Sequence, residues 1–306
     1  MITVGRIFRL ACEIRLRNWK IRRGISLLFR LFLRRHEVSS VLDFFEKTEF
    51  RRKIFSQQHD IIDIVPRNLL YARSTPAERA QAMIDHFTFC EKVFTEDAIL
   101  KIYRGVRFPL GGGIEIDGKQ IRYTLQFTDG DRKEGLMVLE ISLDNVRVYQ
   151  VNFWFAPAKD GTTPALWVGA LQGANADDAQ DIIKKLSKHF AFLRPKNLMM
   201  HIVQAFARET GCGKLYAVAN HGYYAQNGVR VDRKLKTDLD EFWRELGGTE
   251  LSEDARFFDI PLDEIRKSES EMKPNKKSMY RKRFKMLDAL YAEIHERLAP
   301  LKRQAA

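Results

Sequence analysis

Apolar positions recur with helical spacing at both ends of the chain and alternate with polar positions in the middle. Over 6–35 they return every three, four or seven residues, which predicts a helix. Short helices are expected over 39–104, and the clearest of them starts near residue 75. There Ser74 or Thr75 can serve as the N-cap, Pro76 fits the first turn, and Glu78 can complete a capping box with Thr75.

The sequence pattern changes at about residue 105. From there apolar and polar residues alternate between turn signals. This pattern is typical of antiparallel strands. The expected strands are 113–117, 120–128, 135–143, 146–155 and 165–173. The Gly111–Gly113 run lacks the spacing of a dinucleotide-binding motif, and we expect a loop there.

Helical patterns return after residue 174 and alternate with two more strands. We expect helices over 175–190, 194–211, 238–248 and 277–299, and strands at 214–220 and 256–261. The last helix places Met279, Phe284, Leu287 and Leu290 near one face, which predicts that it packs on the domain. The expected fold class is α+β, with a helical N-terminal region before a mixed, mostly antiparallel sheet.

Composition narrows the choice of partners. The chain has 306 residues, is 45% hydrophobic and carries a net charge of +12, so we expect a sizeable core and an anionic partner. The positive charge concentrates in 1–36 and 273–285. The three cysteines show no metal-ligand spacing, and neither do His59 and His86, so no metal is expected. No stretch is long and apolar enough to span a membrane.

The first predicted helix leaves two alternatives open. An apolar stripe runs along one side of this helix. The opposite side is basic and includes Arg9, Lys20, Arg23, Arg30 and Arg34. Such a helix can lie on an anionic phospholipid surface, or it can pack on its own domain and keep its charges in water. We therefore expect a cytoplasmic protein, peripheral on the inner membrane under the first alternative. Nucleic acid is not expected as a partner, since the basic clusters carry few aromatic residues and no recognition motif.

The run "RPKNLMMHIVQAFARETGCGKLYAVANHGYYAQNG" (194–228) resembles the second half of the Gcn5-related N-acetyltransferase fold. That resemblance implies a helix whose N-terminus faces the pyrophosphate of coenzyme A, followed by a strand that ends in an Asn, a Tyr and a Gly. It covers the order of elements; the Gly-rich pyrophosphate loop of that fold is replaced here by "QGANADD" and an extra helix. The implied donor is an acyl-CoA or related thioester. The implied cofactor-binding residues are Gln172, Gly173, Arg194, Lys196, Asn197 and Asn220.

At a finer level the chain is similar to the bacterial VirK/YbjX family. The segments that carry this similarity are "YARSTPAERAQAMIDHF", "LQGAN", "LRPKNLMMHIVQAFA", "LYAVANHGYYAQ", "DLDEFWRELGG" and "EMKPNKKSMYRKRFKMLDAL". They span roughly 40–295. The resemblance implies a bacterial protein associated with envelope stress, resistance to cationic antimicrobial peptides or virulence, and it implies no particular reaction.

Two functions follow as expectations. The first is an acyltransferase-like enzyme, in which Tyr223 or Tyr224 protonates a leaving thiolate and Glu140 or His221 acts as the base. The second is a non-enzymatic module that binds an anionic lipid, a phosphate-bearing small molecule or a protein partner at the inner membrane surface. The expected domains are a basic helix (1–36), a helical region (37–104), an acetyltransferase-like core (105–265) and a basic C-terminal helix with its tail (266–306).

Overall fold

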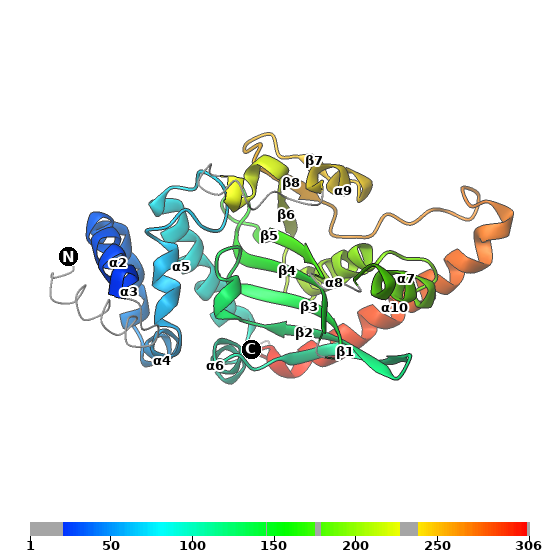
Figure 1. Ribbon diagram of the computed structural model, residues 1–306, viewed down its shortest axis with the longest axis horizontal. Helices are drawn as coiled ribbons and strands as arrows, with labels where there is room; N and C mark the ends of the chain where they lie inside the picture. The colour runs from blue at the N-terminus through cyan, green and yellow to red at the C-terminus, as the bar shows by residue number, and fades with distance from the viewer. Residues whose placement is uncertain (1–20, 145, 175–178, 227–237, 305–306) are drawn as a thin grey trace.

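An eight-stranded mixed sheet lies at the centre of the molecule (Figure 1). The structure is a computed structural model, and it describes residues 21–144, 146–174, 179–226 and 238–304. The strands follow the order β1-β2-β3-β4-β5-β6-β8-β7. Their bounds are β1 Phe108–Ile116, β2 Lys119–Gln126, β3 Met137–Leu143, β4 Val146–Pro157, β5 Pro164–Gly173, β6 Lys214–Val218, β7 Thr249–Glu250 and β8 Phe257–Ile260.

Strands β5 and β6 run parallel, and the other neighbours in the sheet are antiparallel. Parallel neighbours need a crossover connection, which α7 (Ala179–His189) and α8 (Pro195–Glu209) belong to here. The short helix α9 (Leu239–Glu245) precedes the final hairpin β7–β8. The expected α+β class, with a mostly antiparallel mixed sheet, is confirmed.

The N-terminal part is helical, as the sequence predicts. Its helices are α2 Ile21–Leu33, α3 Arg35–Glu46, α4 Glu49–Gln57, α5 Pro76–Val93 and α6 Glu96–Tyr103. The predicted capping box is present at α5: the Glu78 backbone N–H donates to Thr75 Oγ1 over 3.2 Å, and the Thr75 N–H donates to Glu78 Oε2 over 2.6 Å. These reciprocal bonds satisfy two donors that a helix start otherwise leaves free.

Helices α5, α8 and α10 (Lys277–Leu298) cover one face of the sheet (Figure 1). The ring centroids of Phe89 in α5 and Phe155 in β4 lie 4.3 Å apart, and those of Phe206 in α8 and Phe153 in β4 lie 5.5 Å apart. All buried apolar residues of this layer belong to one hydrophobic cluster that also includes the N-terminal helices. The opposite face is packed as well, because the buried rings of Trp154 and Trp167 stack there.

Two sequence expectations need correction. The Gly111–Gly113 run is not a loop: it lies inside β1, which has bulges there and pairs with β2. All three glycines have positive φ, and a Cβ on Gly112 would lie 2.4 Å from the Ile121 carbonyl oxygen, so glycine allows the strand to continue.

The second correction concerns α10. Of its predicted apolar face, Leu287 and Leu290 are buried, whereas Met279 and Phe284 are only partly covered. The helix docks through its second half, where Ile294 and Leu298 extend the contact.

Two further expectations concern the membrane. The first half of the first predicted helix, 6–20, lies outside the described residues, and its second half contains α2. No helix in the described part of the chain has the length and apolar character to cross a membrane.

Candidate functional site

A row of polar side chains crosses the face of the sheet opposite α8. Thr124, Glu140, Gln150 and Gln172 are direct cross-strand neighbours on β2, β3, β4 and β5, so their side chains share one face. We call these four residues the polar row. Thr124, Glu140 and Gln150 are buried, although polar residues on a sheet normally face water. Buried polar groups must find partners inside the protein or in a ligand.

Glu134 lies beside the polar row and is its most heavily hydrogen-bonded neighbour. One carboxylate oxygen accepts the Tyr223 hydroxyl over 2.6 Å. The other accepts the side-chain amides of Asn152, over 3.1 Å, and of Gln172. Gln150 joins the network by donating to Asn152 Oδ1 over 3.0 Å and to Gln172 Oε1 over 3.2 Å. The carboxyl group is thus held rigidly by three donors.

The protonation of Glu134 is set mainly by its burial. Only 4% of the residue is exposed. Burial raises the pKa of Glu134 to about 7, the Tyr223 hydrogen bond opposes that rise, and the nearby Asp131 charge adds to it. A carboxyl group with such a pKa exchanges a proton at neutral pH, which is the property that a general acid or base requires.

A bulge in β5 explains why Glu134 lies here. Asn152 pairs with Ala170 and Phe153 with Val168, so Gly169 is an extra residue in β5. A Cβ on Gly169 would lie 1.9 Å from the Glu134 carbonyl oxygen, so the Glu134 backbone approaches the sheet where a side chain is missing.

The same bulge marks the place where two strands part. The β5–β6 pairing ends at Val168 and Ala217, immediately before Gly169. Backbone groups of β5 beyond that point have no partner on β6. Glu134 therefore stands at the opening between two parallel strands, a place where ligands commonly bind.

Glu140, predicted as a base, lies further along the polar row. Its carboxylate accepts the Gln126 side-chain amide over 3.1 Å, and the guanidinium of the half-exposed Arg107 is 3.6 Å away. Two buried oxygen atoms close by, Thr124 Oγ1 and Gln126 Oε1, have no hydrogen-bond partner within the described part of the chain. Less than 1 Å² of either atom is exposed, so these two oxygens are left unsatisfied inside the described part of the protein.

The other residues predicted as catalytic come from the loop after β6. Tyr223 reaches Glu134, and its ring packs edge-on against the buried Tyr224, with centroids 5.0 Å apart. His221 is exposed, in the single turn Asn220–Gly222. Among these three residues, Tyr223 is the one whose contact with the Glu134 carboxylate the structure describes.

Asn220 instead holds the start of α9. Its side-chain oxygen accepts the Leu239 backbone N–H over 2.8 Å, and its side-chain nitrogen donates to Asp238 Oδ1 over 2.8 Å. Both partners belong to the first turn of α9 or its N-cap. The side chain positions the helix that follows the loop.

The predicted phosphate-binding residues gather at the start of α8. Arg194 is the N-cap residue, donates to Asn197 Oδ1 over 2.9 Å, and pairs with Glu245 of α9. The Lys196 ammonium lies 4.3 Å from the centroid of the Phe242 ring, and burial lowers its pKa. Arg194 is half-exposed, so its charge remains accessible.

This basic helix start lies close to the end of β5. Gly173 pairs with Tyr149 of β4. Burial raises the pKa of Tyr149, and the nearby Arg194 charge opposes that rise. Gln172, a predicted cofactor-binding residue, donates to Glu134 and precedes Gly173 in β5.

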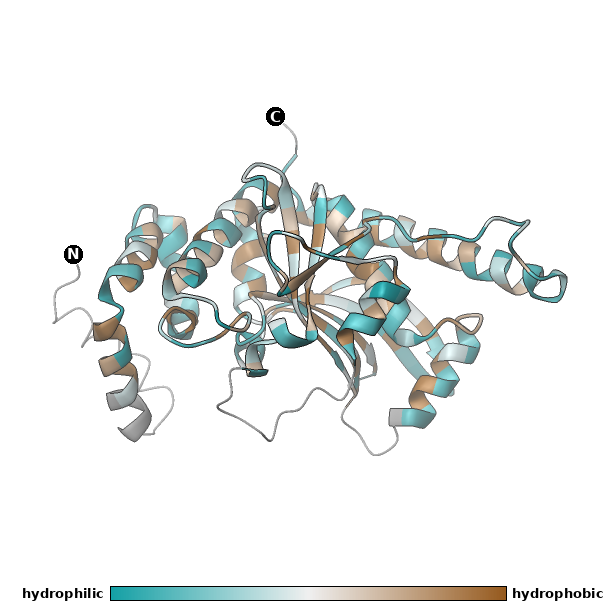
Figure 2. Cartoon of the chain, turned by 90° about the horizontal axis from the view of Figure 1, so that it is seen from above, coloured by the Kyte–Doolittle hydropathy of each residue, from teal (hydrophilic) through white to brown (hydrophobic). Residues whose placement is uncertain are grey.

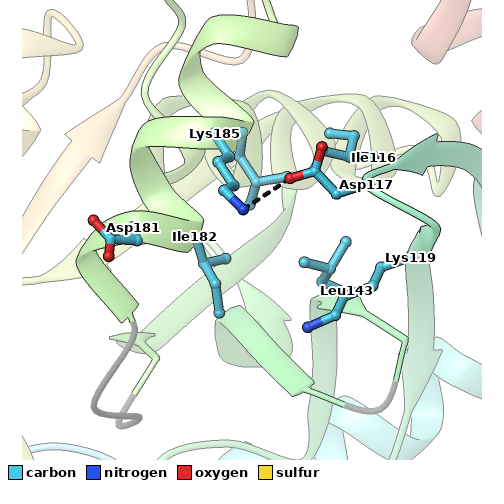
Figure 3. Close-up of a pocket in the computed structure, with 8 residues that line it drawn as sticks. Ile116, Asp117, Lys119, Leu143, Asp181, Ile182 and Lys185 are labelled. Carbon is cyan, nitrogen blue, oxygen red and sulfur yellow. Dashed lines mark ion pairs between the residues drawn. The ribbon is translucent and has the colours of Figure 1, made fainter.

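A separate groove opens between the β1–β2 hairpin and α7 (Figure 3). It encloses about 230 Å³, and its apolar wall includes Ile116, Leu143 and Ile182. An ion pair of 2.8 Å between Asp117 and Lys185 crosses it. No residue of the polar row lines this groove, and we do not assign the site to it.

Comparison with known proteins identifies the family. A family model described as a protein of unknown function, DUF535, matches residues 17–296. The chain belongs to the DUF535 family. The uncharacterised protein YbjX of Escherichia coli is 25% identical to this chain over 186 residues, which cover 59% of this chain and 55% of YbjX. The expected relationship to the VirK/YbjX family is confirmed.

Two uncharacterised proteins of Haemophilus influenzae are also similar. One is 28% identical over 271 residues, 88% of this chain and 87% of its own length. The other is 24% identical over 269 residues, 87% of either chain. No solved structure matches this DUF535 chain.

Sequence reasoning missed Glu134, Asn152 and Gln150, the centre of the network in this DUF535 chain. Glu134 follows the charged residues 131–133 and therefore has the pattern of an exposed turn. One signal was available: Gln150, Asn152 and Gln172 are amides inside strands otherwise rich in apolar residues. Within the described ranges no group of three or more potential metal ligands comes together.

Proposed function

We propose that this DUF535 chain is an acyl-transfer enzyme that takes its acyl group from a thioester such as acyl-CoA. Glu134 and Tyr223 form the proton-transfer pair in this proposal, and an amine or hydroxyl compound is the acceptor. The observation that carries it is the buried Glu134 carboxylate, hydrogen-bonded to the Tyr223 hydroxyl where β5 and β6 part. The pKa of about 7 suits a base that works at neutral pH.

The order of elements supports this choice of reaction. The Gcn5-related acetyltransferase resemblance predicts a helix between two parallel strands that separate, followed by an Asn at the end of the second strand. Helix α8 lies between the parallel strands β5 and β6, ends before Gly211 at positive φ, and is followed by β6 and Asn220. The departure is α7, an additional helix before α8.

The basic start of α8 is the proposed site for the donor's phosphates. The first turn of a helix has free N–H groups and a partial positive charge, and Arg194 and Lys196 add full charges. The Glu245 carboxylate now pairs with Arg194 and would compete with a phosphate for it. The Arg194 charge acts on Tyr149, which pairs with Gly173, and the preceding Gln172 donates to Glu134.

In the proposed step every proton that is removed is returned, and the last transfer uses the observed hydrogen bond between Tyr223 and Glu134. The acceptor attacks the thioester carbonyl carbon and gives its proton to ionised Glu134 while the C–N or C–O bond forms. The C–S bond breaks, and the Tyr223 hydroxyl protonates the leaving thiolate. Glu134 then returns its proton to Tyr223 along the hydrogen bond that joins them.

Calorimetric titration with coenzyme A tests the donor site. Wild-type protein is expected to bind coenzyme A, and Arg194→Gln is expected to weaken binding about tenfold, since a hydrogen bond to a charged group typically contributes 1.5–3 kcal/mol. Arg244→Gln is the matched control, because Arg244 of α9 is a similarly exposed arginine whose ion pair is with Glu250 of β7. Absence of coenzyme A binding, or equal weakening by both variants, would contradict the donor site.

A further inference from the structure

The outward face of α2 carries an exposed apolar patch. Phe29, Phe32 and Leu33 are 63%, 44% and 55% exposed, while Leu27 and Leu31 on the opposite side are buried. Residues three and four positions apart lie on the same face of a helix, so the three exposed side chains are neighbours. In the described residues the other large exposed apolar side chains are Val106, Val146, Phe192 and Ile265, which are spread over the chain.

Arginines surround this patch. Arg30, Arg34 and Arg35 are exposed, and the Arg35 guanidinium carbon lies 5.4 Å from the centroid of the Phe32 ring. Glu37 is the nearest acidic residue in sequence, at the start of α3. The surface therefore combines apolar side chains with at least two more positive than negative charges.

Helix α2 lies at one end of the molecule, and the start of α10 lies at the opposite end (Figure 1). Figure 2 shows brown segments of α2 beside teal ones at that end. An exposed apolar face with a basic border suits an anionic bilayer surface. The aromatic and aliphatic side chains would enter the acyl boundary, and the arginines would remain at the level of the phosphates.

We propose that α2 docks this protein onto an anionic phospholipid bilayer through Phe29, Phe32 and Leu33, with Arg30, Arg34 and Arg35 binding lipid phosphates. The inference is independent of the proposed acyl transfer, because it concerns residues of α2 and α3 and not the sheet. Charge complementarity selects the bilayer over an uncharged apolar partner, since the patch has a basic border and the chain has a net charge of +12.

Vesicle co-sedimentation of the full chain tests this proposal. The protein is expected to bind vesicles that contain phosphatidylglycerol at low salt, and to bind pure phosphatidylcholine vesicles much less. The combined variant Phe29→Ser, Phe32→Ser, Leu33→Ser should lower the partition coefficient by a factor of about ten or more. The combined variant Arg30→Gln, Arg34→Gln, Arg35→Gln should lower it by a factor of about five per charge, with less effect at high salt.

The control is Phe192→Ser, which removes another exposed phenylalanine just beyond α7. It should bind vesicles like the wild type. All variants should keep the wild-type melting temperature, because the replaced side chains are exposed. The proposal is overturned if the wild type does not sediment with anionic vesicles, if neutral vesicles bind it equally, if either combined variant binds like the wild type, or if Phe192→Ser loses as much binding.

Discussion

Replacing Glu134 with glutamine is expected to make the protein more stable at pH 8, by about 3 kcal/mol, at 1.36 kcal/mol per pKa unit. The folded-state pKa of about 7 lies above the ordinary value of 4.5. A raised carboxyl pKa contributes stability that is complete below about pH 4.5 and is lost as the pH rises through 7. Glutamine has no charge to desolvate, so it avoids this loss.

The hydrogen bonds of the site permit this replacement. A glutamine oxygen can accept from Asn152 and Gln172, and its amide can donate to the Tyr223 oxygen. Urea unfolding at pH 5 and pH 8 measures the effect, with exposed Glu115→Gln as the control. The stabilisation should largely disappear at pH 5. A loss of stability at pH 8 would show that the ionised carboxylate is favourable where it lies.

The second large effect is expected at Gly169. A Cβ there would lie 1.9 Å from the Glu134 carbonyl oxygen and 2.9 Å from Trp154 Cζ3. Relief requires the backbone to move, so Gly169→Ala should destabilise the protein by about 3 kcal/mol, at the upper end of overpacking. It should also displace Glu134 from Tyr223.

Gly130→Ala is the matched control, because a Cβ at Gly130 meets nothing within 4 Å. Its unfolding midpoint in urea should remain near that of the wild type. If Gly169→Ala unfolds at the same midpoint as Gly130→Ala, the close approach of the 134 backbone to β5 does not hold in solution.

Local signals in the sequence were sufficient for most of the fold. The capping box at Thr75 and Glu78 is present as predicted, because its bonds join residues three apart. Alternation located the strands, but the Gly111–Gly113 run was misread, since a glycine-rich bulge looks like a loop unless its partner strand is known.

The candidate site was only partly predictable. Tyr223 and Gln172 were chosen from the resemblance, and the structure brings them together on Glu134. Glu134 itself was not found, because alternation cannot distinguish a polar side chain that faces water from one buried on a sheet. Its burial depends on Gly169, which is 35 positions later in the sequence and makes room for its backbone.

The roles predicted for Asn220 and Arg194 remain predictions of ligand binding. In this structure Asn220 binds the start of α9, and Arg194 binds Glu245 of the same helix. Helix α9 thus contacts both residues, and a ligand would exchange with these contacts. Sequence spacing alone does not reveal such competing partners, because α9 lies about 20 residues after Asn220 and about 50 after Arg194.

The measurement that tests the account most directly is the release of free thiol from acetyl-CoA, followed against pH for wild type and Glu134→Gln. The account predicts that the thioester is cleaved at a rate that rises with pH through a pKa near 7. Cleavage should be faster with an amine acceptor than with water. Glu134→Gln should lower that rate by about 10²–10⁴-fold, the usual contribution of a general base, while coenzyme A binding remains. Thiol release at the wild-type rate in Glu134→Gln, or no release by the wild type with any amine or hydroxyl acceptor offered, would contradict the account.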